Sequence, residues 1–473
     1  MSHAPLDFTE FYQGINSFGG NSILFTRRTI SNFNNRITTV DFHRNLLFIE
    51  FADCKFFGEI NLFDSLKKSD LRITFNNCTF EGSLQIQDCE FEALCFFDTN
   101  QVSNKFEIYG NKFNFFFFKN RDRGSSIELI GNIEICNNVF YEKVDIQNLN
   151  HVSGSFEFIE NVLETSKRKP SLHTLKAAFN NSKFHNANFS MTNFGKEVGF
   201  DQTVLTGEEG LQNFNDCHFG RAYFNQTDFG SYALFNGSNF HDTVILNGCS
   251  GVEKTIVDFS GCNFENDVYF HNIQFRSLTI VNSTFKQKTV FKNVEFENID
   301  LSGTLFEKTC SFDDLKILNV GNCGRRTLRS IKQQLQKTEN RIDYNRFKIY
   351  ELDAYKNELT LNQWKEKFIL RLNSISSKHG TDWFKGVLFT LICGGVFYTL
   401  YFIAEYHSQE FQITCDSLNF FLKGFFKFLL PSYTSPFENG LIFWFQYIPF
   451  ILGKIFIAYG IYQTIVSFRK FRL

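Results

Sequence analysis

The sequence predicts a mainly β protein: a solenoid of short strands, followed by an α-helical connector and a two-helix transmembrane hairpin. Three observations carry this prediction. A six-residue phrase returns along the first two thirds of the 473-residue chain, a heptad pattern follows it, and two long apolar stretches lie near the end. The repeated phrase also explains the composition, since Phe is 64 of 473 residues while Pro is 5 and Met is 2. Usage so far from the average indicates one type of position used many times.

The phrase starts with Phe or an aliphatic residue, places a small residue fourth and ends in Phe. Clear examples are FNDCHF at 214–219, FNQTDF at 224–229, FSGCNF at 259–264 and LSGTLF at 301–306. The terminal Phe residues follow one another in steps of ten or eleven within each run, with a hydrophobic residue about halfway between. A period of five fits neither an α-helix nor a flat strand, so the chain is expected to turn after each short strand. Four such faces close one square coil of roughly 21 residues, with strands stacked at the ordinary spacing.

The terminal Phe side chains are expected to form a ladder inside the coil, made of Phe219, Phe229, Phe240, Phe264, Phe275, Phe285, Phe296 and Phe306. The small residue two places before each Phe is expected to take a second inward position, as Cys217 and Cys262 do. Because Ser and Thr fill the same slot elsewhere, a structural row of thiols explains these cysteines better than a metal site. Thiols of a cytoplasmic domain stay mostly reduced, so disulfides are not expected.

These phrases resemble the pentapeptide-repeat family over roughly residues 40–322, most specifically between Phe179 and Phe306. The resemblance implies a right-handed quadrilateral β-helix with Leu or Phe at the central inward position and Ala, Ser, Cys or Thr two residues before it. Both ends of such a solenoid expose unpaired backbone, so caps are expected. We therefore predict an N-terminal cap at 1–39, a solenoid at 40–322 with a loop near 165–171, a helical connector at 323–380 and a membrane module at 381–473.

The connector begins with a heptad in steps of three and four, formed by Leu328, Ile331, Leu335, Thr338, Ile342, Asn345, Ile349 and Leu352. Six of these eight residues are apolar, which is typical of a helix. The seam is short for a coiled coil and has two polar members. Packing on the last coil of the solenoid is therefore favoured, and a homo-oligomer stays open.

The membrane module contains two candidate spans, 386–404 and about 440–467, with Trp383 and Trp444 close to the start of each. The first has 19 residues without a charge, which suits a bilayer core about 30 Å thick. Basic residues flank both ends of the hairpin: residues 323–385 carry 14 Lys and Arg against 7 Asp and Glu, and Arg469, Lys470 and Arg472 close the chain. Since Lys and Arg accumulate on the cytoplasmic side, both termini are predicted to be cytoplasmic, in an inner-membrane protein with two spans.

The solenoid is predicted to stay in the cytoplasm because the first 30 residues have no signal peptide. The phrases at 370–390 and 451–471 resemble the tail of bacterial membrane-bound pentapeptide-repeat proteins, and this resemblance implies topology more than activity. The split of charge agrees with it: residues 1–322 carry 28 Lys and Arg against 39 Asp and Glu, whereas residues 323–473 carry 20 against 11. The two parts are therefore expected to face different surroundings.

Two features of the membrane module carry charge into apolar sequence. Lys454 lies near the middle of the second span, where a bare ammonium costs several kcal/mol, so it is expected to snorkel, to face an oligomeric pore or to pair inside the membrane. The segment 418–430 is strongly apolar and contains Lys423 and Lys427, four residues apart. It is expected to be an amphipathic helix in the outer interface or a re-entrant pore helix. The order of span, loop and span resembles the pore module of ion channels, but no TVGYG filter is present, so potassium selectivity does not carry over.

No catalytic motif is recognisable: phosphate loops, dinucleotide fingerprints, HExxH and GxSxG are all absent from the sequence. We therefore expect no enzyme, no cofactor, no metal and no small-molecule substrate. Membrane lipid is one expected partner, and an unknown protein that binds the solenoid is another. The negative charge of the solenoid is too dilute to favour DNA mimicry, although residues 201–250 hold six acidic residues against Arg221 alone. The sequence thus favours a membrane-anchored scaffold, with an oligomeric ion channel or membrane-perturbing pore as the alternative.

Overall fold

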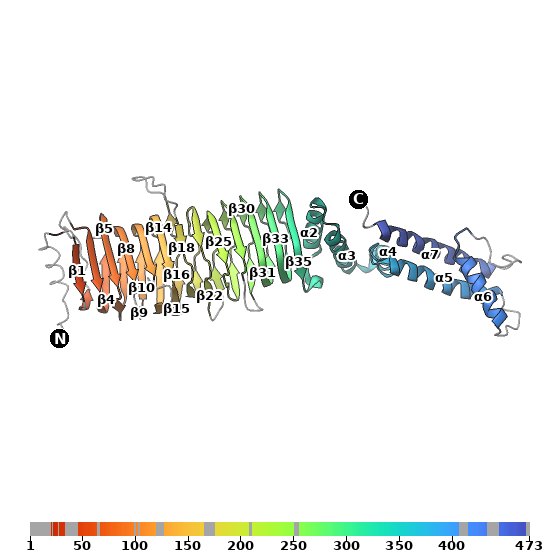
Figure 1. The fold of residues 1–473 in the computed structure, drawn as a ribbon, viewed down its shortest axis with the longest axis horizontal. Coiled ribbons are helices and arrows are strands. Elements are labelled where there is room, and N and C mark those ends of the chain that lie inside the picture. Colours follow the sequence, from red (N-terminus) through yellow and green to blue (C-terminus); the bar gives the residue numbers. More distant parts are fainter. Residues whose placement is uncertain are drawn as a thin grey trace. The chain divides into compact units, whose positions relative to one another are not determined.

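The computed structural model describes residues 20, 22–26, 28–33, 46–63, 67–98, 101–102, 105–119, 127–164, 176–207, 211–249, 255–405, 415–432 and 444–469. The chain divides into two units, Met1–Ser330 and Ile331–Leu473. The first unit contains the strands, which follow one another from β1 to β35 in the red to green part of Figure 1. The second unit is helical.

The first unit is a parallel β-solenoid, as predicted, because paired strands run parallel from one coil to the next. We group its strands into four columns. The first column contains β1 (Ser22–Thr26), β3 (Phe48–Ala52), β5 (Lys67–Asn76), β8 (Glu90–Phe97), β11 (Lys112–Lys119), β14 (Val139–Gln147), β18 (Lys176–Ala178), β21 (Glu197–Gly199), β25 (Arg221–Asn225), β28 (Val244–Asn247), β31 (Val268–Thr279), β33 (Thr289–Asp300) and β35 (Cys310–Ile317).

The second column contains β2 (Thr29–Phe33), β4 (Lys55–Phe63), β6 (Thr79–Phe80), β9 (Gln101–Val102), β12 (Ile127–Ile130), β15 (Leu149–Ser153), β19 (Lys183–His185) and β22 (Val204–Thr206). The third contains β7 (Leu84–Gln87), β10 (Lys105–Tyr109), β13 (Asn132–Cys136), β16 (Phe156–Glu157), β20 (Ala187–Asn188), β23 (Leu211–Asn213), β26 (Tyr232–Leu234) and β29 (Ile256–Asp258). The fourth contains β17 (Val162–Leu163), β24 (His218–Phe219), β27 (Asn239–Phe240), β30 (Asn263–Phe264), β32 (Thr284–Phe285) and β34 (Leu305–Phe306).

The length of a coil varies along the solenoid. Phe270 pairs with Phe291, and Phe291 with Phe312, each 21 residues later, as the repeat predicts. Val144 instead pairs with Ala177, 33 residues later. The loop predicted near 165–171 falls in this longer interval, outside the described residues.

The chain bends at corners where a residue adopts a positive φ. Asn and Asp tolerate this left-handed conformation better than other residues with a Cβ, because their short polar side chains hydrogen-bond locally. They occupy many of these corners, including Asp53, Asn77, Asp88, Asn137, Asn181, Asp216, Asn272, Asn282 and Asn293. The abundance of Asn in the sequence is therefore partly a property of the corners.

The solenoid starts earlier than predicted. Strand β1 pairs in parallel with β3, and Phe25 stacks on Phe51 with ring centroids 5.1 Å apart. The expected boundary between a cap at 1–39 and a solenoid from residue 40 is therefore too late for these strands. The segment Ser22–Thr26 does not contain the six-residue phrase, so the phrase alone could not reveal it.

The last coil is covered by the start of α2 (Arg325–Lys337), which follows the short 3-10 helix η1 (Val320–Asn322). Thr327 Oγ1 accepts the backbone N–H of Leu301 at 3.0 Å and donates to Asp300 Oδ1 at 2.9 Å. Thr327 and Leu328 are both 0% exposed. The helix thus supplies a partner to a backbone group that an open end would leave unpaired.

The heptad does not form one continuous helix. Helix α2 ends at Lys337, Glu339 has a φ of 59°, and Asn340 caps α3 (Arg341–Glu358) by accepting the N–H of Asp343 at 3.2 Å. Ile342, an expected seam residue, is 76% exposed. Local capping by Asn340 breaks the helix although the apolar spacing continues across the break.

The remaining helices are η2 (Leu361–Gln363), α4 (Trp364–Ser377), α5 (Trp383–Glu405), α6 (Cys415–Leu429) and α7 (Trp444–Arg469). Helices α5 and α7 pack side by side, and α6 lies against both of them. The two stretches 383–404 and 447–469 are long and apolar enough to cross a membrane.

Candidate functional sites

The eight Phe residues of the predicted ladder are buried inside the solenoid, each at most 6% exposed. Five of them form one stack, Phe219, Phe240, Phe264, Phe285 and Phe306, with successive centroid distances of 4.7, 4.6, 4.4 and 5.1 Å. The other three are less regular: Phe229 meets Phe275 edge-on at 6.1 Å, and Phe275 lies tilted at 6.3 Å from Phe296.

The inward cysteines form hydrogen bonds as well as filling space. Cys217 Sγ donates to the carbonyl oxygen of Phe189 at 3.0 Å, and Cys262 Sγ donates to that of Phe235 at 2.9 Å. The backbone N–H of Cys217 in turn donates to Ser238 Oγ at 3.0 Å. Burial raises the pKa of the Cys217 thiol to about 12, so the thiol stays protonated and able to donate. Among the described residues no group of three His, Cys, Asp or Glu side chains could hold a metal ion.

Asparagine takes the same inward slot in the middle of the solenoid, which the sequence interpretation missed. Asn111, Asn138 and Asn161 are each 0% exposed. The backbone N–H of Asn111 donates to Asn138 Oδ1 at 2.9 Å, and that of Asn138 donates to Asn161 Oδ1 at 2.9 Å. Asn138 Nδ2 also donates to the carbonyl oxygen of Ile108 at 2.9 Å. A signal was available, because Asn111 and Asn138 each lie two residues before a Phe.

A buried histidine interrupts the apolar interior. His151 is 0% exposed; its Nε2 lies 2.8 Å from the carbonyl oxygen of Gly131, and its Nδ1 accepts the N–H of His185 at 3.2 Å. The ring therefore donates through Nε2 and accepts through Nδ1, which is possible only for a neutral imidazole. Burial lowers the pKa of His151, in agreement with this geometry.

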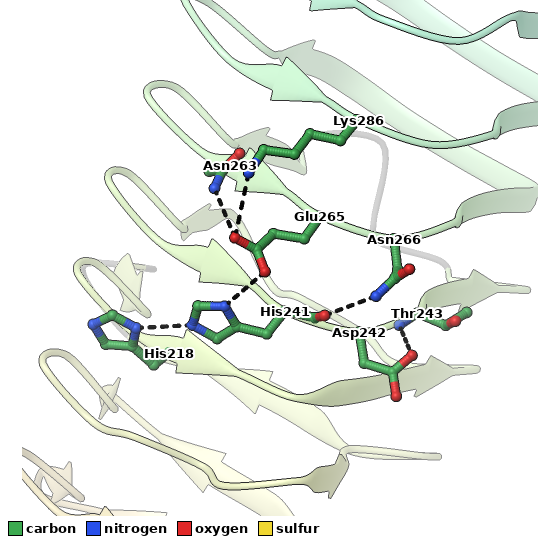
Figure 2. Close-up of polar contacts among 8 residues, drawn as sticks. All are labelled: His218, His241, Asp242, Thr243, Asn263, Glu265, Asn266 and Lys286. Atoms are coloured by element: carbon green, nitrogen blue, oxygen red, sulfur yellow. Dashed lines mark hydrogen bonds and ion pairs between the residues drawn. The ribbon is translucent and has the colours of Figure 1, made fainter.

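Two exposed histidines and a glutamate form a row on the outside of the solenoid, across successive coils (Figure 2). His218 and His241 stack at 5.5 Å, and His218 Nδ1 lies 3.2 Å from His241 Nε2. His241 Nδ1 lies 3.2 Å from Glu265, whose other oxygen is 3.4 Å from Lys286 Nζ. His241 and Lys286 lower the pKa of Glu265. These side chains are open to solvent and form a polar surface on the solenoid.

The acidic stretch 201–250 uses part of its charge internally. Asp201 Oδ1 accepts the backbone N–H of Asn225 at 2.9 Å, and Asp228 Oδ1 accepts that of Gly230 at 2.9 Å. Asp242 pairs with Arg221 at 3.3 Å. The charge available to a basic partner is therefore smaller than the sequence count suggests.

A depression of about 390 Å³ lies over β14, β18, β21 and β25, lined by residues that include Lys143, Lys176, Ala178, Gly199 and Tyr223. Lys176 is paired with Glu197 at 2.8 Å. Close by, the 1%-exposed carboxylate of Asp145 accepts from Lys119 at 2.8 Å and from Lys143 at 2.9 Å. Lys143, Lys176 and Glu197 are thus engaged in ion pairs. Asp201, which also lines the depression, accepts hydrogen bonds from Asn225.

The helices α5 and α7 meet through glycines. A Cβ atom at Gly386 would lie 2.5 Å from Thr464 Oγ1, and one at Gly460 would lie 2.2 Å from Thr390 Oγ1. Close contact of this kind through small residues is typical of helices that pack in lipid. Their other faces carry exposed apolar side chains, including Leu388, Ile392, Val396, Ile403, Ile448, Ile455, Ile465 and Phe468. Trp383 is 46% exposed and stacks on Phe468 at 5.4 Å; the side chain of Trp444 lies outside the described part.

The predicted segment 418–430 is almost wholly helical, in α6. Its inner face packs on α5, where Tyr398 lies 4.9 Å from Phe421 and 5.6 Å from Phe428 between ring centroids. Tyr398 and Phe428 are both 0% exposed. Lys423 lies on the exposed side of the helix. Helix α6 is therefore part of the packed helical module.

Lys454 binds the carboxyl end of α6. Its Nζ donates to the carbonyl oxygens of Phe428 at 2.8 Å and of Leu430 at 2.7 Å. The ammonium also lies 5.1 Å from the centre of the Phe428 ring and 5.6 Å from that of Phe450. A cation at the negative end of a helix dipole, between aromatic rings, is a favourable pairing. Of the three arrangements expected for Lys454, this contact matches pairing inside the module.

The solenoid and its inward rows define the class as a protein with a parallel β-solenoid built on a five-residue repeat. Residues 259–315 match the family model of pentapeptide repeats (9 copies). The chain thus carries pentapeptide repeats within its solenoid, and two long apolar helices follow the solenoid in sequence. No curated protein and no solved structure matches the chain.

Proposed function

We propose that this protein is a non-enzymatic scaffold, anchored in the cytoplasmic membrane by α5 and α7, whose solenoid presents its outer surface to a protein partner. The observation that supports this proposal is that inward and outward side chains have different roles in each coil. Phe, Cys, Ser, Thr and Asn fill the inside and hold the coils together, so only the outward side chains are free to vary. Solenoids with such a division bind partners through their faces.

The anchor is supported by the apolar exteriors of α5 and α7 and by the basic residues beyond their ends. Apolar side chains such as Ile392 and Ile455, 56% and 57% exposed, find suitable surroundings in hydrocarbon. The positive flanks favour an orientation in which the solenoid and the chain end are cytoplasmic and α6 lies toward the outside.

An oligomeric ion channel or membrane-perturbing pore is the second candidate. It is favoured by one observation, the packing of α6 against both apolar helices with Lys454 at its end. A simple anchor does not require a helix in that position.

The orientation can be tested with a native cysteine. Cys415 is exposed at the start of α6, whereas Cys217 and Cys262 are buried. A membrane-impermeant maleimide should label the full-length protein in intact cells at Cys415, and the Cys415→Ser variant should lose this label. Labelling only after lysis would reverse the orientation, and release of the protein by alkaline carbonate would rule out the anchor.

The scaffold and the channel are separated by Lys454→Leu in the full-length protein. For a scaffold, the proteins crosslinked to the solenoid in native membranes stay the same, and liposomes containing the wild type remain impermeable to ions. Glu265→Lys, which inverts one exposed charge, serves as the matched change on the solenoid surface. Ion flux that Lys454→Leu alters would favour the channel instead.

A further inference from the structure

One face of α4 carries large apolar side chains that are open to solvent. Trp364 is 63% exposed, Phe368 55% and Ile375 67%, and Leu361, in the preceding turn η2, is 88% exposed. Steps of three, four and seven residues place these side chains on one side of a helix. Leu372, which is half-buried, fills the gap between Phe368 and Ile375. These five residues form the apolar stripe of α4.

The opposite face of α4 binds α7. Asn373 Oδ1 accepts from the hydroxyl of Tyr459 and, at 3.0 Å, from Gln463 Nε2. Ser377 Oγ donates to Gln463 Oε1 at 2.7 Å. Asn373 and Ser377 lie nine and thirteen residues after Trp364, so on a helix they point about 180° and about 220° away from it. The apolar stripe therefore faces away from α7.

Helix α4 crosses the apolar helices near one end and does not run beside them. These hydrogen bonds join one turn of α4 to one turn of α7, and the amino-terminal half of α4 is exposed on both sides, at Phe368 as well as at Glu366. Gln463 lies six residues before the end of the span 447–469, or about 9 Å along the helix. Five residues after Ser377, Trp383 opens the span 383–404. Helix α4 thus lies close to the level where one span begins and the other ends.

Basic side chains border the apolar stripe. They are Lys365, Lys367, Arg371 and Lys378. The last three follow one another in steps of four and seven residues, along one edge of the stripe. The acidic residue of α4, Glu366, lies on the side opposite the stripe and accepts from the hydroxyl of Tyr355 at 2.8 Å. Aromatic and aliphatic side chains on one face, with Lys and Arg beside them, are typical of helices that lie in the interface of a bilayer.

We propose that α4 is an interfacial membrane helix, which immerses its apolar stripe in the cytoplasmic leaflet and binds anionic phospholipid through the basic residues beside the stripe. The inference rests on the proposed anchoring by α5 and α7 and adds a third contact with the membrane. The aliphatic parts of the Lys and Arg side chains extend along the apolar layer, and their charged ends reach the phosphate groups. A second copy of the chain fits the stripe less well, because two stripes in symmetric contact would bring their basic borders together.

Immersion is tested with a nitroxide on Ile375→Cys in the full-length protein, reconstituted in liposomes that contain phosphatidylglycerol. Cys136, Cys393 and Cys415, the cysteines that are not buried, are replaced by Ser, Ala and Ser. The label at 375 should collide with oxygen dissolved in lipid and be shielded from a water-soluble nickel complex present on both sides of the membrane. Ile342→Cys is the matched control, because Ile342 is an exposed isoleucine of α3, outside the stripe. A label at 342 should show the reverse.

Each other outcome contradicts one part of the reasoning. Equal access of the nickel complex to the labels at 375 and 342 would overturn the interfacial helix. Dipolar broadening between labels at 375, together with shielding from nickel, would show that a second copy covers the stripe and would overturn lipid as its occupant. If the protein does not float with the liposomes after treatment with alkaline carbonate, the anchor itself is wrong. A protein that floats while its label at 375 stays in water retains the anchor and loses only the role of α4.

The stripe and its basic border are tested separately on the label at 375. Trp364→Gln/Phe368→Gln shortens the stripe without removing a buried side chain, and should raise access of the nickel complex in liposomes of phosphatidylcholine alone. Unchanged access would overturn the stripe as the contact with lipid. Addition of phosphatidylglycerol should restore the shielding, because each basic residue near an anionic surface strengthens binding by about fivefold.

Lys367→Gln/Arg371→Gln, made in the variant with the shortened stripe, should weaken this restored binding by about 25-fold and leave the label open to nickel. Lys292→Gln/Lys308→Gln removes the same charge from exposed positions of the solenoid and should leave the shielding in place. If phosphatidylglycerol has no effect, or if both pairs of substitutions act alike, the preference of α4 for anionic lipid is wrong.

Discussion

Replacing Ser283 by alanine should loosen the solenoid at one coil without changing its fold. Ser283 Oγ accepts the backbone N–H of Cys262 at 3.1 Å and donates to the carbonyl oxygen of Phe259 at 2.6 Å, and the residue is 1% exposed. Alanine removes this partner from both buried backbone groups and leaves between them only the longer contact of the Cys262 N–H with the Phe259 carbonyl oxygen, at 3.4 Å. Since a buried unsatisfied group costs about 1–3 kcal/mol, we expect the local free energy of opening to fall by about 2 kcal/mol or more.

Hydrogen exchange of the Cys262 amide measures this effect directly, because opening of a single coil need not unfold the whole array. A loss of about 2 kcal/mol corresponds to roughly 30-fold faster exchange. Ser283→Thr keeps the hydroxyl, as Thr203 and Thr227 do in the same slot, and should retain slow exchange. Equal exchange in the alanine and threonine variants would refute the reasoning, because small volume alone would then explain the slot.

Gly303→Ala should destabilise the solenoid by about 1–2 kcal/mol in denaturant unfolding, because the φ of Gly303 is +73° and a Cβ there would lie 2.2 Å from Asn282 Oδ1. Gly321→Ala is the control: its Cβ would meet nothing within 4 Å, so the substitution should be neutral. Burial lowers the pKa of His151 below its ordinary value near 6.5. The stability that neutral His151 contributes is therefore complete above pH 6.5 and is lost as the pH falls from 6.5 toward the lowered pKa. His151→Gln should make the free energy of unfolding less dependent on pH in this range, as measured by denaturant titration. Gly460→Ala should separate α5 from α7 and lower the midpoint of thermal unfolding in detergent, while Gly395→Ala, whose nearest contact would be 4.0 Å, should leave the midpoint unchanged.

The repeat made the solenoid predictable because every terminal Phe meets the same surroundings. The phrase between Phe214 and Phe306 repeats side-chain size and spacing, and the structure stacks those rings about 4.4–5.1 Å apart. Pattern recognition failed where the residue type changed at a constant position. Asn138 fills the slot that Cys217 fills later, but its amide also binds a neighbouring carbonyl oxygen, which volume alone does not predict.

The ends of the elements were harder to predict than their type. Strand β1 lacks the phrase and depends on its pairing with β3, a contact between residues more than twenty positions apart. The heptad continued across Asn340, where capping of α3 outweighs the apolar spacing. Sequence patterns describe which face is apolar, and tertiary contacts and caps decide where an element begins and ends.

The helices α5, α6 and α7 show the same limit. Length and hydropathy predicted both apolar helices and the helix at 418–430, but left Lys454 with three possible surroundings. Its contact with the carbonyl ends of Phe428 and Leu430 joins segments 24 and 26 residues apart in sequence. No local pattern reports such a contact, because the acceptors are backbone atoms that every residue carries.

The buried asparagines also bear on how the chain finds its register. Coils with interchangeable rungs could pair one step too early or too late at little cost, since each Phe would still find a Phe and each hydroxyl a carbonyl. Asn111, Asn138 and Asn161 are not interchangeable with those rungs, because each carboxamide must place a donor and an acceptor at once. A shift by one coil would break the hydrogen bonds between carboxamides, such as that from Asn138 Nδ2 to Asn161 Oδ1 at 3.1 Å. The loss of these hydrogen bonds would make a misaligned register less stable than the native one. One polar residue fixes the alignment of a coiled coil in the same way.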